Sequence, residues 1–197
     1  MKRILDIPKS IKNVSKALSD AGFENFVVGG CVRDLIIGRE PKDWDLNTNA
    51  TPEQIIALFP KTFYENDFGT VGVVNEDETN ERLKVIEVTP YRIESGYSDF
   101  RRPDSVVWGK NVEQDLARRD FTINALAYDV QNNKLIDLYD GENDIEKKII
   151  KTVGKPDERF GEDALRMLRA LRFASTLDFV IQLETHEAIQ RNAHLLA

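Results

Sequence analysis

Residues 26–34 read Phe-Val-Val-Gly-Gly-Cys-Val-Arg-Asp and predict a short buried strand that turns directly into a helix. The apolar start is typical of a buried strand, and the glycines permit a tight turn. Gly29 and Gly30 would let backbone N–H groups approach a phosphate closely, while Arg33 adds positive charge in the first helical turn. No Walker A or dinucleotide-binding spacing follows. Taken alone, a turn without a ligand is the stronger interpretation.

Asp43 and Asp45 follow in a predicted second strand over 43–46. Residues two apart in a strand point to the same face, so the two carboxylates would repel each other unless a cation or a proton intervenes. The pair therefore indicates a divalent metal ion. On its own an Asp-x-Asp is weak evidence, because a solvated turn is at least as common.

Glu87 is a candidate third carboxylate. In a strand over 83–89 it would share its face with a leucine, a valine and a threonine, which is a largely apolar surface. A lone carboxylate is costly there unless it binds a metal or pairs with a basic group. An open sheet edge or an ion pair with Arg92 explains this residue equally well.

Residues 115–125 contain the adjacent arginines Arg118 and Arg119 with acidic residues on both sides. Such a cluster usually forms a salt-bridged surface, but it can also present a guanidinium group to a triphosphate.

A later helix combines one acid and three arginines. Steps of three residues keep side chains on one slanting stripe of a helix, and this stripe consists of Asp163, Arg166, Arg169 and Arg172. An Asp–Arg pair one turn apart can read the Watson–Crick edge of a base. The alternative is an ion pair worth about a few tenths of a kcal/mol. The neighbouring stripe of Leu165, Leu168 and Leu171 is expected to pack.

Each motif loses to its structural alternative when it is taken singly, but together they describe one site with a metal, a phosphate cradle, a phosphate clamp and a base reader. The remaining pattern predicts an α/β order. Helices are expected over 8–21, 32–37, 51–59, 111–116, 121–127, 164–177 and 184–196, and strands over 26–28, 43–46, 70–74, 82–89 and 135–138. The strands over 70–74 and 82–89 should pair as an antiparallel hairpin, and residues 91–109 should form a mobile loop.

The 197 residues carry 27 basic and 34 acidic side chains, a formal net charge of −7, and 41% are hydrophobic. This composition predicts a globular protein and argues against indiscriminate nucleic-acid binding. No apolar run reaches the roughly 20 residues of a membrane helix, and no signal peptide is evident, so we expect a cytoplasmic protein without a membrane partner. With one cysteine and two distant histidines, any metal would be held by carboxylates, which favours Mg²⁺.

Two regions are expected, an α/β domain over about 1–150 and the start of a helical region over 151–197. Residues 154–156, Gly-Lys-Pro, mark the joint. The last predicted helix is still amphipathic at Ala197, which suggests a truncated chain.

Four ordered motifs resemble those of the bacterial class II tRNA nucleotidyltransferases, the CCA-adding enzymes of the polymerase-beta superfamily. They are Val28-Gly29-Gly30-x-Val32-Arg33-Asp34, Asp43-x-Asp45, Arg118-Arg119-Asp120-Phe121-Thr122-x-Asn124-Ala125 and Glu162-Asp163-x-Leu165-Arg166-x-x-Arg169-Ala170-x-Arg172-Phe173. The resemblance implies an α/β (α+β) nucleotidyltransferase head with a mixed or antiparallel sheet, followed by an all-α neck. It also implies template-independent addition of CMP and AMP, from CTP and ATP, to the 3′ end of tRNA by two-metal nucleotidyl transfer.

By this resemblance Asp43 and Asp45 hold Mg²⁺, with Glu87 as the third carboxylate. The implied nucleotide-binding residues are Gly29, Gly30, Arg33, Arg119, Asn124, Asp163, Arg166, Arg169 and Arg172. Among them, Gly30, Arg33 and Arg119 would contact the triphosphate and sugar. Asp163 and Arg166 would pair with the base, and the other two arginines would assist from the same helix.

Residues 91–103 resemble the flexible loop that family members use to add the final A, and enzymes that add only CC lack it. Family members continue into a helical body and tail, so this chain corresponds to the catalytic head and the beginning of the neck. A bacterial poly(A) polymerase and an A-adding tRNA nucleotidyltransferase are close alternatives, which differ in their use of CTP. A non-catalytic nucleotide-binding or RNA-binding fragment is the alternative from a different class, and it would bind nucleotide without turnover.

Overall fold

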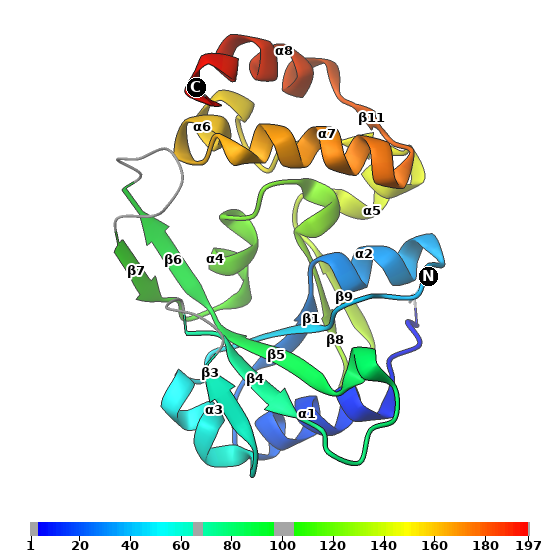
Figure 1. Ribbon diagram of the computed structural model, residues 1–197, viewed down its shortest axis with the longest axis vertical. Helices are drawn as coiled ribbons and strands as arrows, with labels where there is room; N and C mark the ends of the chain where they lie inside the picture. Colours follow the sequence, from blue (N-terminus) through cyan, green and yellow to red (C-terminus); the bar gives the residue numbers. More distant parts are fainter. Residues whose placement is uncertain (1–3, 65–68, 97–104, 197) are drawn as a thin grey trace.

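The computed structural model describes residues 4–64, 69–96 and 105–196 and shows a mixed α/β fold around a seven-stranded sheet (Figure 1). The strand order is β3-β4-β5-β2-β1-β8-β9, and every neighbouring pair is antiparallel except β2 with β5. The strands are β1 (Asn25–Val28), β2 (Asp45–Thr48), β3 (Thr62–Tyr64), β4 (Val71–Val74), β5 (Val85–Pro90), β8 (Leu126–Asp129) and β9 (Lys134–Asp137). The predicted fold class, an α/β (α+β) head with a mixed sheet, is confirmed.

Two smaller strand pairs lie outside this sheet. Strands β6 (Arg92–Ser95) and β7 (Ser105–Trp108) form an antiparallel hairpin, and the two-residue strands β10 (Ile149–Ile150) and β11 (Val180–Ile181) pair in parallel.

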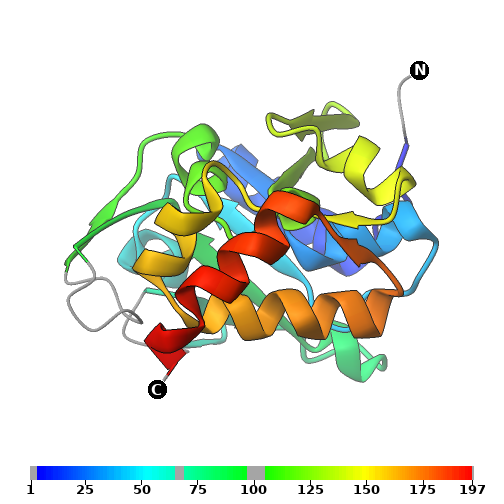
Figure 2. The same ribbon diagram turned by 90° about the horizontal axis from the view of Figure 1, so that it is seen from above.

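The helices are α1 (Lys9–Asp20), α2 (Gly30–Ile37), α3 (Pro52–Leu58), α4 (Val112–Ala117), α5 (Gly141–Glu146), α6 (Pro156–Glu162), α7 (Leu165–Leu177) and α8 (Leu183–Asn192). Short 3-10 turns occupy Glu81–Leu83, Thr122–Asn124 and Ala193–Leu196. Helix α3 begins with a complete capping box between Thr51 and Gln54, which satisfies two backbone N–H groups at its start. Helices α6, α7 and α8 gather at one end of the molecule, and α8 packs against α6 (Figures 1 and 2). Within the described ranges, no helix has the length and apolar character needed to cross a membrane.

The sheet has two faces with different surroundings. Leu46, Ile86 and Val88 belong to the large apolar core that also contains the buried side chains of α1 and α3. Successive residues of a strand point to opposite faces, so Asp45 and Glu87 lie on the other face. That second face is covered in part by Tyr91 and α4, which pack on β1 and β8 in a separate cluster. The acidic residues of β2 and β5 therefore lie where the sheet is partly open.

Two strand predictions need correction. Strand β2 begins at Asp45, so Asp43 precedes the strand instead of lying within it. In β5 the predicted alternation holds, but the buried apolar face is that of Ile86 and Val88, while Glu87 is only partly buried. Strand β5 is also internal to the sheet, so the open-edge alternative for Glu87 is wrong. The alternation of side chains along a strand determines which residues share a face. The packing of α1 and α3 determines which of the two faces is buried.

The prediction of a loop over 91–109 is wrong where β6 and β7 form. Each strand is only four residues long and carries charged or exposed positions, so neither shows a clear period. Residues 97–104, the middle of the predicted loop, lie outside the described residues. The helix predicted over 121–127 is a 3-10 turn followed by strand β8, which is covered on both faces: Leu126 and Tyr128 lie in the large core and Ala127 in the second cluster.

Helix α7 packs by a different side than predicted. Leu165, Leu168 and Leu171 are 38%, 49% and 50% exposed, whereas Ala170 and Phe173 join the main core. The helix contains two apolar stripes, and the stripe that carries Phe173 faces the core, where its ring meets Phe121 edge to face. The last helix is also shorter than predicted, because α8 ends at Asn192 and a 3-10 turn follows.

We predict that Gly141→Ala lowers the free energy of unfolding by about 1–3 kcal/mol, as overpacking does. A Cβ at Gly141 would lie directly against the carbonyl oxygen of Thr122, which cannot move without displacing the 3-10 turn Thr122–Asn124. Urea unfolding at pH 7 measures this change. The matched control is Gly161→Ala in α6, where a Cβ meets no heavy atom within 4 Å. The control should be neutral or up to about 1 kcal/mol more stable, and equal stability of the two variants would contradict the prediction.

Candidate functional site

The strand-to-helix turn at Gly29 requires a residue without a Cβ. Gly29 has φ +77°, and an added Cβ would lie 2.6 Å from Nη1 of Arg119. Its N–H donates to the carbonyl oxygen of Leu126, and its carbonyl accepts from the N–H of Arg33. At Gly30 a Cβ would come within 3.5 Å of the Arg33 guanidinium. The predicted turn is present, and arginine side chains lie against it.

Three acidic residues were predicted beside this turn. Asp45 and Glu87 are direct register partners across the parallel β2–β5 pair, so their side chains share a face. Asp43 is exposed and lies just before β2. The charge of Asp45 also affects Cys31 in α2, because burial and then that negative charge raise the pKa of the Cys31 thiol to about 12. Asp45 therefore lies beside the start of α2.

Asp45 lies in an environment that opposes its negative charge. Burial raises the pKa of Asp45 above its ordinary value, the charge of Arg119 acts in the opposite direction, and the charge of Asp43 raises it further. Asp43 and Asp45 are thus close enough to repel each other, as two carboxylates do when no cation lies between them. In the described ranges, no group of three His, Cys, Asp or Glu side chains is arranged to hold a metal ion. A metal ion at this position would therefore be held by the carboxylates of Asp43 and Asp45.

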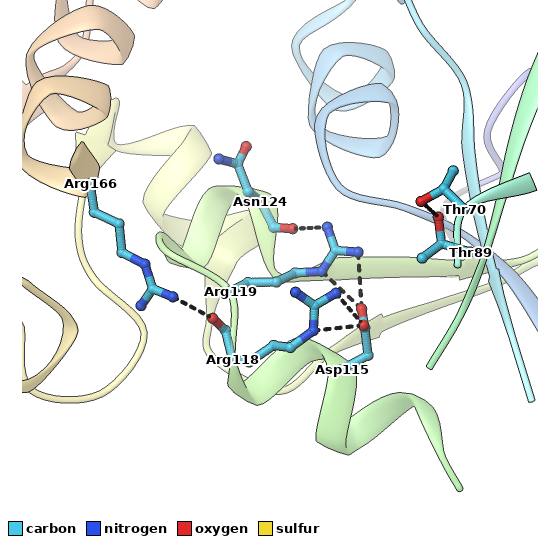
Figure 3. A network of polar contacts seen from close by, with 7 residues as sticks. All are labelled: Thr70, Thr89, Asp115, Arg118, Arg119, Asn124 and Arg166. Atoms are coloured by element: carbon cyan, nitrogen blue, oxygen red, sulfur yellow. Dashed lines mark hydrogen bonds and ion pairs between the residues drawn. The ribbon is translucent and has the colours of Figure 1, made fainter. Parts of the chain in front are cut away.

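A buried carboxylate fixes both adjacent arginines (Figure 3). Asp115 in α4 is fully buried and accepts from Nε and Nη2 of Arg118 at 3.0 and 2.6 Å. Its other oxygen accepts from Nε and Nη2 of Arg119 at 3.2 and 3.0 Å. Burial acts to raise the pKa of Asp115, but the charges of Arg119 and Arg118 outweigh it and hold that pKa below its ordinary value.

Asn124 connects the two sides of the glycine turn. The backbone carbonyl oxygen of Asn124 accepts from Nη1 of Arg119 at 3.3 Å, and its side-chain oxygen accepts from Nη1 of Arg33 at 2.6 Å. The side-chain nitrogen of Asn124 donates to one carboxylate oxygen of Asp120 at 3.2 Å. The other carboxylate oxygen of Asp120 accepts from Nε of Arg169 at 2.7 Å. A continuous chain of polar contacts therefore joins the glycine turn to helix α7.

The base-reading pair predicted on one helix is split between two elements. Asp163 caps the C-terminus of α6, between that helix and α7, and its carboxylate accepts from the N–H of Leu165 at the start of α7. Burial raises the pKa of Asp163, although the N–H of Leu165 and the charge of Arg166 oppose the increase. Arg166 is buried, donates to Glu162 at 2.9 Å, and also donates to the carbonyl oxygen of Arg118 at 3.3 Å (Figure 3).

The structure thus brings most of the predicted residues into one region, from Gly29 and Arg33 through Arg119 and Asn124 to Arg169. Asp115, Asp120 and Glu162 hold the arginines in place, and none of the three was predicted as a site residue. For Asp115 and Glu162 the signal was an acid three or four residues from each of two arginines, whereas Asp120 pairs with Arg169, which is distant in the sequence. Farther along the face that carries Glu87, the hydroxyls of Thr70 and Thr89 lie 3.1 Å apart (Figure 3).

Solved structures share this fold. The crystal structure of the Bacillus stearothermophilus CCA-adding enzyme in complex with CTP superposes with a TM-score of 0.84 at 39% identity, covering 96% of this chain and 45% of that one. A tRNA nucleotidyltransferase complexed with a primer tRNA and an incoming ATP analog gives a TM-score of 0.75 at 27% identity, covering 92% and 50%. This chain therefore has the fold of the matching part of a tRNA nucleotidyltransferase.

The sequence profile of the poly A polymerase head domain matches residues 25–151. That match covers more than half of the chain, and the chain belongs to this family.

Among curated relatives, the CCA-adding enzyme of Lactobacillus johnsonii is 49% identical over 185 residues, covering 93% of this chain and 45% of that protein. The CCA-adding enzyme of Limosilactobacillus reuteri (strain DSM 20016) is 46% identical over 197 residues, covering 100% and 47%. The chain therefore spans about half the length of the curated relatives it matches.

We predict that Asp115→Asn lowers the free energy of unfolding at pH 7 by about 3 kcal/mol, because it leaves two arginines against a neutral buried group. The folded-state pKa of Asp115 lies below the ordinary 3.8. Its contribution is therefore complete above about pH 5 and is lost as the pH falls through that lowered pKa. Urea unfolding of both proteins between pH 7 and pH 3 should show a constant difference above pH 5 that narrows below pH 4.

The control for this series is Asp20→Asn, which removes an exposed i,i+4 pair with Lys16. Exposed pairs contribute little, so the control should stay within about 0.5 kcal/mol of wild type. An Asp115→Asn protein as stable as this control at pH 7 would show that the carboxylate does not hold the arginines.

Proposed function

We propose that this chain contains the catalytic head of a CCA-adding tRNA nucleotidyltransferase, which adds CMP and AMP to the 3′ end of tRNA from CTP and ATP without a template. The observation that carries the proposal is the glycine turn at Gly29, with Arg119 against it and Arg33 held by Asn124 beside it. Two fixed guanidinium groups next to a helix start suit a triphosphate. The names of the relatives and of the superposed structures support the same activity.

A divalent metal fits the acidic side of this site, and we propose Mg²⁺. Asp43 and Asp45 would hold it, because their oxygen donors suit a hard cation and their mutual repulsion would be relieved by one. Mg²⁺ is commonly held by one or two carboxylates together with substrate phosphates, so a cluster of three protein ligands is not required. When bound, it supplies positive charge that activates the primer 3′-hydroxyl and stabilises the triphosphate in a two-metal transfer. Glu87, the register partner of Asp45, is the proposed third carboxylate.

The other side chains bind and orient the nucleotide. Gly29 and Gly30 allow close approach of the backbone, and Arg33 and Arg119 bind the triphosphate and sugar with Asn124 holding both arginines. Asp163 and Arg166 select the base, with Arg166 oriented by Glu162. Such fixed positions reduce the entropy that the reaction must lose when primer and nucleotide meet.

We propose the division into a head over 1–150 and the start of a neck over 151–197. Poly(A) polymerase is the second candidate, because the matching family profile carries that name. An A-adding tRNA nucleotidyltransferase and a non-catalytic nucleotide-binding fragment are further alternatives.

The deciding experiment incubates the chain with a tRNA that lacks its 3′ CCA and with CTP, ATP or both, and then sequences the product. Addition of CC with CTP alone, and of CCA with both nucleotides, supports the proposal. An A tract without use of CTP identifies a poly(A) polymerase, and nucleotide binding without any product identifies a non-catalytic module.

We predict that Asp43→Asn and Asp45→Asn each reduce transfer about 1,000-fold or more, because each removes a metal ligand. Stability should not fall, since burial and the charge of Asp43 together outweigh the attraction of Arg119 for the Asp45 carboxylate. Single-turnover addition of CMP and urea unfolding measure the two quantities. The matched control is Asp20→Asn, an exposed acid in α1, and wild-type rates in either site variant would remove the metal assignment.

We predict that Asp163→Ala combined with Arg166→Ala brings the kcat/KM values for CTP and ATP to within about tenfold of each other at a position where wild type selects one nucleotide. Lost hydrogen bonds to a base edge reduce discrimination by about 1–3 kcal/mol each. Glu162 stays paired with Arg159, so no buried charge is left alone. Arg191→Ala, which breaks an exposed pair with Asp157, is the control for loss of an arginine. Unchanged selectivity in the double variant would contradict the base-reading role.

A further inference from the structure

Phe173 in α7 is surrounded by three arginines. The Cζ atoms of Arg33, Arg169 and Arg172 lie 5.3, 5.4 and 5.3 Å from the centre of its ring. Each distance is within the roughly 6 Å at which a guanidinium group is attracted by an aromatic face. The ring is 9% exposed and makes an edge-to-face contact with Phe121, with the centroids 5.9 Å apart. The environment of the ring is therefore both well packed and strongly cationic.

These arginines come from two separate parts of the chain. Arg33 belongs to α2 at the glycine turn, and the other two belong to α7. The polar chain from Arg169 through Asp120 and Asn124 to Arg33 joins the same two helices by hydrogen bonds. The ring of Phe173 also contacts Arg33 and Arg169, the two ends of that series of hydrogen bonds. Hydrogen bonds and ring contacts therefore both connect the glycine turn with α7.

An aromatic ring can gather guanidinium groups without neutralising them. Arg33 is paired with Asp34, and Arg169 with Asp120. For Arg172, the described part of the chain shows the contact with Phe173 and no ion pair. An aliphatic side chain of similar size would fill the space but would offer no attraction to three like charges that repel one another. A carboxylate would attract them and cancel part of the charge.

We propose that Phe173 is a positioning residue that holds Arg33, Arg169 and Arg172 together as one cluster for the triphosphate of the incoming nucleotide. The inference rests on the function proposed above and deepens it, because it assigns the α7 arginines to the phosphate groups through their shared ring. Phe173 acts through the arginines and has no contact of its own with the reacting atoms. The attraction lies in the ring face, so changing the electrons of the ring should affect nucleotide binding even when its volume is kept.

The experiment compares three changes at Phe173 in the full 197-residue chain: Phe173→Leu, Phe173→Tyr, and replacement by pentafluorophenylalanine, which keeps the ring shape but removes its negative face. Binding of CTP and of inorganic tripolyphosphate, each with Mg²⁺, is measured by calorimetry, and KM and kcat are measured for CMP addition. Tripolyphosphate has no base or sugar, so it reports the phosphate subsite alone. Phe179→Leu is the control, because Phe179 is a core residue of similar exposure, 7%.

The leucine and fluorinated variants should weaken binding of both probes about tenfold, which corresponds to about 1.4 kcal/mol, and raise KM more than they lower kcat. The tyrosine variant should stay within about twofold of wild type. Phe179→Leu should lose stability without losing affinity. Wild-type affinity for tripolyphosphate in the fluorinated variant would overturn the inference while leaving the proposed function intact. If the unmodified chain binds neither probe, the proposed function fails and the inference fails with it.

Discussion

The buried carboxylate of Asp115 is the constraint on which the arrangement of the site depends. It lies in α4, accepts four hydrogen bonds from Arg118 and Arg119, and has no solvent exposure with which to compensate for a lost partner. Arg119 is thereby held against Gly29, where only a residue without a Cβ leaves room. The glycine turn and the buried ion pair therefore depend on each other, although ninety residues of sequence separate them.

The second constraint joins the sheet to the helices that follow it. Asp120 accepts from Asn124 on one oxygen and from Arg169 on the other, and the ring of Phe173 packs between Arg33 and the arginines of its own helix. Phe173 also belongs to the same apolar core as the strands of the sheet. A helix docked by an aromatic side chain and a charged hydrogen bond has little freedom to rotate about its axis. Its polar side chains are consequently presented in fixed positions, as the proposed selection of a base would require.

The sequence correctly predicted those helices and turns whose formation depends on residues close together in the chain. The helices predicted over 8–21 and 51–59 and the turn at Gly29 and Gly30 are found within one residue of where the sequence placed them. Several of the wrong predictions concern which residues are buried, because burial depends on contacts between segments that are distant in the sequence. Leu168 and Ala170 lie on different stripes of one helix, and only the packing of α7 against the rest of the molecule decides that the smaller residue is buried. The carboxylates of Asp115 and Glu162 were likewise visible as neighbours of arginines, but their burial depends on α4, α6 and α7 coming together.

The charge distribution explains how an acidic chain can offer a site to an anionic substrate. The net charge is −7, yet arginines concentrate where the glycine turn meets α7, and several of them share a carboxylate. Arg118 and Arg119 both bind Asp115, and Arg159 and Arg166 both bind Glu162. A shared carboxylate orients two guanidinium groups with a single negative charge. Each such group of three side chains therefore keeps a net positive charge. Acidic residues elsewhere on the surface disfavour indiscriminate attachment to nucleic acid. Under the function proposed above, the arginines fixed at the glycine turn would bind the triphosphate of a nucleotide, while the acidic surface disfavours other attachment.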